Sequence, residues 1–345
     1  MIEGLVSVVM PCFNTARYVA EAAASVLSQT HRNLELIAID DGSVDGTVDI
    51  LSAMADPRLR IIRNSRNLGI VESLNSGFRE ARGEFIARMD ADDVALPERF
   101  ERQVAFLRRQ PELAAVGTGV SYIDENGRPQ RSPRLPPTSP IGLRWRLLLG
   151  NCVHHPTIMF RRSQLMLPVY SSAYADIEDY EIFLRLAASS MLANLPERLL
   201  CMRRHELSVS GRRHQIQLAA AATLLSRHCA AEYGVSVSAS DFRHVLDPCS
   251  WLAADPASNP VNTVRRLRGA FTKKHLAVDR NELAGIDVDE AFFIAKVLSV
   301  TVSEANSASL VRRLTLLLSA ATAGLRRPLA MLRALQQDKS RHQIS

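Results

Sequence analysis

Short apolar runs alternate with helically spaced apolar residues over the first hundred positions of the chain. Residues 5–10 form a β-branched apolar run that ends at a proline, as a buried strand does. In residues 18–27 the apolar side chains then recur every third or fourth position, which predicts a helix. The same alternation continues, and we expect further strands at residues 34–39, 59–63 and 84–89 with helices between them.

Four strands joined by helices and short loops predict an α/β fold with a doubly wound, mostly parallel sheet. In open sheets of this kind, ligands bind beyond the carboxyl ends of the strands. Polar clusters follow all four predicted strand ends, at residues 11–14, 40–41, 66–67 and 90–93. We therefore expect these four segments to form one site.

The pattern changes along the rest of the chain. Helices are expected at residues 97–109 and 177–190, and strands at 114–123, 154–161 and 199–203. From residue 215 the sequence becomes rich in Ala, Leu and Arg without strand-like alternation, which indicates a helical extension. We place one domain at residues 1–212 and the C-terminal extension at residues 213–345.

Composition excludes several classes of protein. With 47% hydrophobic and 23% charged residues, the chain can bury a core and is not disordered. The five cysteines have neither zinc-site nor disulfide-framework spacing, and the N-terminus lacks a signal-peptide pattern, so we expect a cytoplasmic location. No apolar stretch reaches the roughly 18 residues of a membrane-spanning helix.

Positive charge is concentrated in the C-terminal part. Residues 203–345 contain 20 Lys and Arg against 12 Asp and Glu, and residues 310–345 combine helically spaced leucines with flanking arginines. This pattern fits an interfacial helix on the anionic inner face of a membrane, and equally a core helix packed on the domain or on a second subunit. Aromatic residues are sparse there, so we expect no nucleic-acid partner.

The acidic strand ends suggest a divalent cation. Asp90 and Asp92 point the same way if the backbone is extended, and oxygen ligands suit Mg²⁺ or Mn²⁺, which neutralise a diphosphate leaving group. A single strand-end aspartate would more simply cap a helix. For Asp40, Asp41, Asp90, Asp92 and Asp93 together, the ligand site is the better interpretation.

The chain lacks both the G-x-G-x-x-G fingerprint and the P-loop after its first strand. A nucleotide would have to be held by other groups. Phe13 could stack on a base and Asp40 could accept a hydrogen bond from a base N–H, although Phe13 alone would more simply be a core residue.

These motifs, taken in order, resemble those of the family 2 glycosyltransferases. The segments that carry the resemblance are SVVMPCFN at 7–14, SVLSQT at 25–30, DDGSVDGT at 40–47, NLG at 67–69, LNSG at 74–77, MDADD at 89–93, HPT at 155–157, EDYE at 178–181 and RRH at 203–205. The resemblance covers residues 5–210 and implies the nucleotide-diphospho-sugar transferase type A fold and an inverting transfer.

The resemblance also implies roles for single residues. Asp40 matches the base-contacting aspartate, Asp90 the acid near the ribose and metal, Asp92 the metal ligand and Asp179 the catalytic base. Arg203 and His205 match contacts to the diphosphate and metal, although Met202 stands where an aromatic residue is common. The remaining residues expected at the nucleotide are Pro11, Phe13, Asn14 and Asn67.

Some features of this site have a simpler explanation. Glu178 and Asp179 would also suit the first turn of a helix, and both roles are compatible. His154 and His155 do not suggest a metal site, because adjacent residues of a strand face opposite ways. We expect His155 to position the acceptor loop.

The expected function is a metal-dependent transfer of a sugar from a nucleotide-diphospho-sugar, with a UDP-sugar preferred, to a hydroxyl of a saccharide or lipid-linked acceptor. The resemblance implies that this transfer serves cell-envelope or exopolysaccharide synthesis. A nucleotidyltransferase is the first alternative, but residues 10–18 offer only Arg17 where a triphosphate would need a glycine-rich basic loop. A non-catalytic nucleotide-sugar-binding protein is the second, and it would not need the acidic pair Glu178 and Asp179.

Overall fold

The computed structural model describes residues 1–189, 191–205, 214–251 and 259–275, with a few further positions between 285 and 297. The chain divides into two compact units, residues 1–143 with 152–213 and residues 144–151 with 214–345. This division lies next to the expected boundary at residue 212. The sequence pattern did not indicate that residues 144–151 belong with the second unit.

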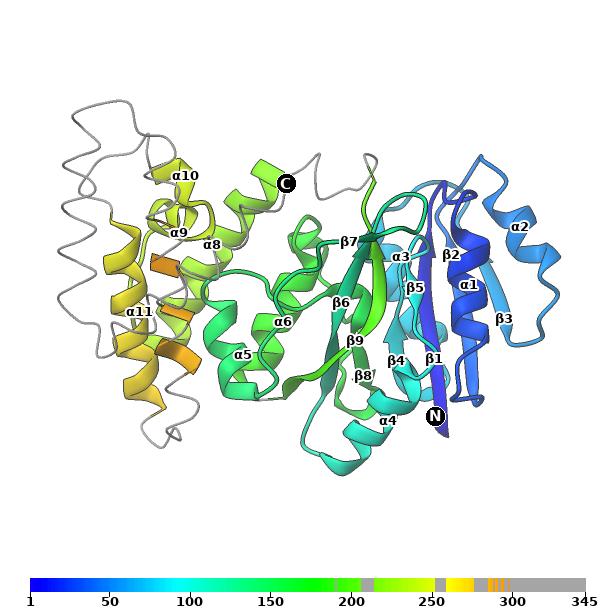
Figure 1. Cartoon of the computed structure of the whole chain (residues 1–345), viewed down its shortest axis with the longest axis horizontal. Helices are drawn as coiled ribbons and strands as arrows, with labels where there is room; N and C mark the ends of the chain where they lie inside the picture. The colour runs from blue at the N-terminus through cyan, green and yellow to red at the C-terminus, as the bar shows by residue number, and fades with distance from the viewer. Residues whose placement is uncertain are drawn as a thin grey trace. The chain divides into compact units, whose positions relative to one another are not determined.

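The first unit is built on one nine-stranded sheet (Figure 1) with the order β3-β2-β1-β4-β8-β6-β9-β5, and β7 pairs with β6 at the side. The strands are β1 (Ile2–Cys12), β2 (Leu34–Asp40), β3 (Leu59–Arg63), β4 (Gly83–Arg88), β5 (Val94–Ala95), β6 (Ala115–Ile123), β7 (Pro129–Gln130), β8 (Met159–Arg161) and β9 (Leu192–Arg203).

The first four strands are parallel, as the alternation predicts. β1 lies between β2 and β4, so the order of the strands reverses there, and this is the switch point at which ligands bind in open α/β sheets. Cys12 at the end of β1 pairs with Asp40 at the end of β2. The predicted strand ends therefore meet at one edge of the sheet.

The sheet continues beyond β4 with strands of both directions. β8 runs antiparallel to β4 and to β6, and β9 runs parallel to β6. The expected strand at 154–161 begins instead with a 3-10 turn (His155–Thr157), because Pro156 has no N–H and Thr157 Oγ1 donates to the His154 carbonyl at 2.7 Å.

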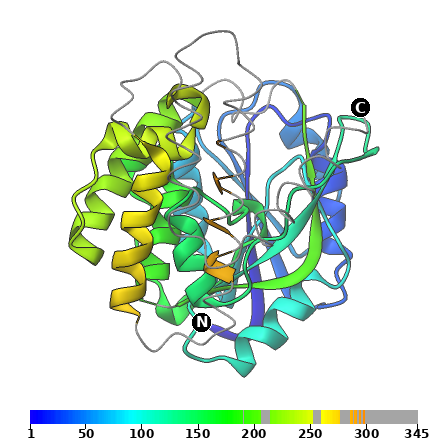
Figure 2. The same cartoon turned by 60° about the vertical axis from the view of Figure 1, so that its left-hand side comes forward.

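Helices cover both faces of the sheet (Figure 2). Alternate residues of β1 show the division: Val6, Val8 and Met10 lie in a core with α1 (Val19–Leu27), α2 (Thr47–Ala53) and α4 (Arg99–Arg109), whereas Val9 contacts α3 (Ile70–Glu80) on the other face. α6 (Glu178–Ala188) lies on the α3 side, where Phe183 and Phe78 join one chain of aromatic contacts.

The second unit is helical in its described residues, as expected. Its helices are α8 (His214–Tyr233), α9 (Ala239–Leu246), α10 (Pro248–Trp251) and α11 (Pro260–Lys274), together with the end of α5 (Pro140–Leu147). Part of the basic charge pairs inside the unit: Arg268 contacts Glu290 at 3.0 Å, and Arg146 contacts Asp289 at 2.5 Å.

The expectation of a membrane-bound or core helix at residues 310–345 lies outside the described residues. None of the helices in the described part of the chain has the length and apolarity needed to cross a bilayer.

Gly77 sets how closely α3 approaches β1. A Cβ built at Gly77 would lie 2.3 Å from Val9 Cγ1, so Gly77→Ala should lower the free energy of unfolding by about 1–3 kcal/mol. Urea unfolding measures this loss, and the double variant with Val9→Ala should recover part of it. Gly269→Ala in α11, where a Cβ meets nothing within 4 Å, is the control and should not destabilise the protein. A Gly77→Ala protein as stable as the parent would contradict this packing.

Candidate active site

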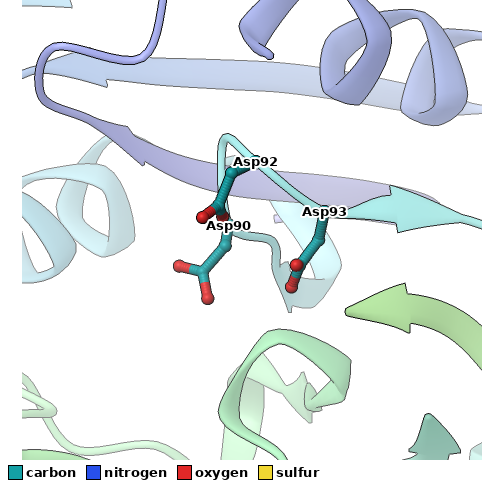
Figure 3. A group of neighbouring side chains, drawn as sticks. All are labelled: Asp90, Asp92 and Asp93. Carbon is teal, nitrogen blue, oxygen red and sulfur yellow. The ribbon is translucent and has the colours of Figure 1, made fainter. Parts of the chain in front are cut away.

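The acidic turn after β4 is the centre of the candidate site. Asp90, Asp92 and Asp93 each offer one carboxylate oxygen, and these oxygens lie within 4.8 Å of one another. Figure 3 shows the carboxylates of Asp90 and Asp92 close together, with Asp93 turned to one side. The turn follows the last residue of β4 directly, at the switch point of the sheet. The expected convergence of these residues is therefore present.

Each of these three carboxylates has a different partner. Asp90 is bound by the guanidinium of Arg88, with Nη1 donating to Oδ2 at 2.5 Å. Asp92 Oδ2 lies 2.9 Å from His205 Nε2, so the structure brings together the two expected metal ligands although 113 positions separate them. Asp93 Oδ1 accepts the Arg203 backbone N–H at 2.8 Å.

The electrostatics of the turn favour a bound cation. Burial, together with the charges of Asp90 and Asp92, raises the pKa of Asp93 well above its usual range. Burial also raises the pKa of Asp90, partly opposed by Arg88 and increased by Asp92. Asp93 Oδ2 is buried and has no hydrogen-bond partner among the described residues. A divalent ion would offset this concentration of negative charge.

The donor atoms also fit a small divalent ion. Neighbouring ligands of an octahedral Mg²⁺, each about 2.1 Å from the metal, are about 3 Å apart. The 2.9 Å between Asp92 Oδ2 and His205 Nε2 matches that separation. Oxygen and imidazole nitrogen are both ligands that Mn²⁺ accepts. The same 2.9 Å contact is a hydrogen bond between the two side chains, and Asp92 and His205 stay the predicted ligands of the ion.

The ends of β1 and β2 form the expected nucleotide side. Asp40 is fully buried, its Oδ1 accepts the Ser43 N–H at 3.2 Å, and Arg63 Nε approaches its Oδ2 to 3.5 Å. That Oδ2 is buried and has no hydrogen-bond partner among the described residues. Its expected bond from a base N–H stays a prediction. Phe13 is 47% exposed, which leaves its ring free for stacking, and Pro11 is still part of β1.

Hydrogen bonds tie the surrounding loops to each other. Asn14, whose φ is +52°, receives the Val44 N–H on its Oδ1 at 3.0 Å and donates its own N–H to Ser43 Oγ at 2.9 Å. Asp41 accepts the backbone N–H groups of Leu68 and Gly69, both at 2.9 Å. Asp41 thus holds the loop after β3 rather than joining the acidic turn, and the neighbouring Asn67 is exposed.

Arg203 is buried and already bonded within the protein. Its side chain donates from Nε to the Asp92 carbonyl at 2.8 Å and from Nη2 to Glu21 at 2.6 Å, and it lies 4.7 Å from the ring centre of Tyr18. In this arrangement Arg203 fixes the acidic turn against α1. Its expected contact with a diphosphate stays a prediction.

The start of α6 forms the expected acceptor side. Asp179 is the second residue of α6, and its charge contributes to the raised pKa of Asp90, so the two carboxylates lie within electrostatic reach. Burial and the Asp179 charge raise the pKa of Glu178 to about 7. The charge of the expected base thus acts on the acidic turn from another element. Its role in the reaction stays a prediction.

Sequence reasoning missed three buried residues beside this site. Asn75 clamps the Tyr170 backbone, donating from Nδ2 to its carbonyl at 2.8 Å and accepting its N–H at 3.0 Å. The Tyr170 hydroxyl lies 2.9 Å from His155 Nε2, so His155 contacts the segment before α6. Its role in positioning an acceptor loop stays a prediction. Arg88 is the third, and an arginine that directly follows the apolar residues Phe85, Ile86 and Ala87, two positions before Asp90, could have revealed it.

The raised pKa of Glu178 predicts a stability change with pH. Because its pKa is raised in the folded state, stability falls as pH rises from the unfolded value of 4.5 through about 7. Glu178→Gln should remove this penalty and stabilise the metal-free protein at pH 8 by up to about 2–3 kcal/mol, with little effect below pH 4.5.

Thermal unfolding at pH 4.5, 6 and 8 tests the Glu178 prediction. Glu72→Gln, on the exposed face of α3, is the control for the loss of one negative charge. If the stability difference between Glu178→Gln and the parent protein were the same at pH 4.5 and at pH 8, the prediction would be wrong.

Comparison with known sequences identifies the family of the chain. The model of a family described as glycosyl transferase family 2 matches residues 7–166. The O-antigen biosynthesis glycosyltransferase WbnJ of Escherichia coli is 32% identical over 216 residues, which cover 60% of this chain and 82% of that protein. The chain spans 66% of the length of two further glycosyltransferase relatives, from Haemophilus influenzae and Bacillus subtilis.

Solved structures show the same fold at low sequence identity. Residues 1–349 of S. aureus TarS, in complex with UDP-GlcNAc, superimpose with a TM-score of 0.53 at 16% identity, covering 97% of this chain and 91% of that one. A mannosyltransferase of Pyrobaculum calidifontis, in complex with GDP-Man and Mn²⁺, has a TM-score of 0.51 at 18% identity, covering 97% and 87%.

Proposed function

Because the chain belongs to family 2 of the glycosyltransferases, we propose that it transfers a sugar, with inversion, from a nucleotide-diphospho-sugar to a hydroxyl of a saccharide or lipid-linked acceptor. The observation that carries this proposal is the acidic turn at the end of β4, within electrostatic reach of the Glu178–Asp179 pair at the start of α6. The acidic turn would serve the donor, and the Glu178–Asp179 pair would serve the acceptor.

The proposed reaction is a single displacement at the anomeric carbon. The acceptor oxygen forms a bond to that carbon while the bond to the diphosphate oxygen breaks on the opposite face, and Asp179 removes the proton of the acceptor hydroxyl. The nucleoside diphosphate leaves with the electron pair of the broken bond. A Mn²⁺ or Mg²⁺ ion bound by Asp92 and His205 supplies positive charge for the diphosphate.

The nucleotide is expected to lie between the ends of β1 and β2. The buried Asp40 carboxylate would accept a base N–H, a group that both uracil and guanine offer, and Phe13 would stack on the base. Asn14, Asn67 and Asp90 would border the ribose and phosphates. We expect a UDP-sugar, while the GDP-Man in one solved structure of this fold makes GDP-sugars the necessary comparison.

The biological setting follows from the relatives. WbnJ is named for O-antigen biosynthesis, and we propose polysaccharide synthesis for this chain. The acceptor would be met on the cytoplasmic side, with peripheral contact to an anionic membrane as a further expectation.

Release of nucleoside diphosphate tests the proposed function. The purified protein is mixed with Mn²⁺, an acceptor extract and one UDP- or GDP-sugar at a time, and the diphosphate is measured enzymatically. A transferase should release diphosphate in step with sugar incorporated into acceptor. Incorporation of nucleoside monophosphate from a triphosphate, with pyrophosphate release, would show a nucleotidyltransferase instead. Binding of the donor without any product would show a binding protein.

A further inference from the structure

Arg88 is a buried charged residue whose backbone N–H and carbonyl are both hydrogen-bonded. It is 5% exposed and is the last residue of β4. Its backbone N–H donates to the Ile158 carbonyl at 2.9 Å, and its carbonyl accepts a hydrogen bond from Arg99 Nη2 at 2.7 Å. Arg99 is itself fully buried in α4. The backbone of Arg88 therefore has little freedom to move.

The side chain of Arg88 engages both oxygens of Asp90. Nη1 donates to Oδ2 at 2.5 Å, and Nη2 contacts Oδ1. Such a two-point pair of guanidinium and carboxylate fixes orientation as well as charge. Asp92, two residues further on, points its Oδ2 at His205 instead. Asp90 is thus paired with the Arg88 guanidinium, and Asp92 with the His205 imidazole.

We propose that Arg88 is a positioning residue that assigns different tasks to Asp90 and Asp92. By binding both oxygens of Asp90, Arg88 holds that carboxylate in one orientation beside the cation rather than on it. The remaining lone pairs of Asp90 are then available to accept hydrogen bonds from the hydroxyl groups of the donor. Asp92 and His205 are left to hold the ion. This inference rests on the proposed function, because it assumes a cation and a nucleotide-sugar at the acidic turn.

The charges make the proposal testable, since removal of Arg88 has opposite effects on metal binding and turnover. Arg88→Met leaves the Asp90 charge uncompensated beside Asp92, so a divalent ion should bind more tightly. The freed Asp90 can then turn to the ion and no longer faces the donor, so turnover should fall. A purely structural role for Arg88 would weaken both.

The experiment is a cycle of four full-length proteins, the parent, Arg88→Met, Asp90→Asn and the double variant, titrated with Mn²⁺ by electron paramagnetic resonance in the presence of UDP. We expect Mn²⁺ to bind about tenfold more tightly to Arg88→Met and about tenfold more weakly to Asp90→Asn. The double variant, which loses one charge of each sign, should bind within about twofold of the parent. Arg79→Met, an exposed arginine of α3, is the control and should leave the affinity unchanged.

Turnover is measured on the same proteins. We expect Arg88→Met to lower kcat about 100-fold, whereas Arg88→Lys, which keeps the charge but cannot bind both oxygens in the same way, should lower it about tenfold with parental Mn²⁺ affinity. Unchanged or weaker Mn²⁺ binding by Arg88→Met would overturn the proposal. If Arg88→Met does not fold, the double variant Arg88→Met/Asp90→Asn decides. A Mn²⁺ affinity close to that of the parent supports the proposal, and an affinity more than tenfold different overturns it.

Failure of the proposed function would look different from failure of the Arg88 proposal. A parent protein that binds Mn²⁺ with UDP but releases no diphosphate from any donor would contradict the transferase activity. A parent protein that transfers sugar but binds no Mn²⁺ would leave the activity standing and overturn the division of roles between Asp90 and Asp92.

Discussion

Asp179→Asn is expected to slow the chemical step by about 10²- to 10⁴-fold, because the acceptor hydroxyl would lose the group that takes its proton. The affinity for the donor should hardly change, since Asp179 lies on α6, whereas the residues expected to bind the base, Phe13 and Asp40, lie just after β1 and at the end of β2. Rapid-quench measurement of single turnovers, together with the Kd of the donor, separates these two quantities.

The control for Asp179 is a second acid in the same helical turn. Glu181 pairs with Arg185 at 3.0 Å, so Glu181→Gln removes an equal charge from the start of α6 without touching the proposed base. It should keep nearly all activity if the role of Asp179 is chemical. Equal losses in the two variants would mean that Asp179 acts only through the helix terminus. A variant that loses donor binding but keeps its maximal rate would place Asp179 in the nucleotide pocket.

Asp92→Asn is expected to reduce turnover by about 10³-fold or more, because the loss of a principal metal ligand removes several kcal/mol of stabilisation from the developing diphosphate charge. Nucleotide binding should weaken in the presence of Mn²⁺ and change little in its absence. Initial rates and nucleotide affinities with and without added metal measure both effects.

Asp49→Asn, on the exposed side of α2, is the control for the change of charge. Full activity of the parent protein in excess chelator would exclude a metal-dependent transfer. Loss of nucleotide binding by Asp92→Asn in the absence of metal would show that Asp92 contacts the nucleotide directly.

Local sequence patterns predicted the part of the fold that local patterns control. Each of the first four strands is a short segment rich in apolar residues with a helical repeat after it, and this alternation is the signature of a parallel α/β sheet. The polar residues at the strand ends then had to meet at one edge. The acidic turn and the ends of β1 and β2 were therefore predictable together.

Contacts between distant parts of the chain were not predictable in this way. The strand expected at 199–203 is the end of β9 (Leu192–Arg203), whose pairing with β6 is interrupted near Pro196. Asn75 and Tyr170 are 95 positions apart, and their hydrogen bonds leave no periodic trace in the sequence. Only the family resemblance indicated that His205 returns to Asp92.

The hydrogen bonds between the loops after β1 and β2 have a consequence for the kinetics of nucleotide binding. Thr15 donates its N–H to Thr47 Oγ1 and Ala16 donates to Asp45, both at 2.9 Å, beside the reciprocal bonds between Asn14 and residues 43–44. The walls of the proposed nucleotide pocket thus stand in place before the ligand arrives. Little conformational entropy remains to be lost on association, so a nucleotide should enter in a single kinetic phase limited by diffusion and orientation rather than by loop closure.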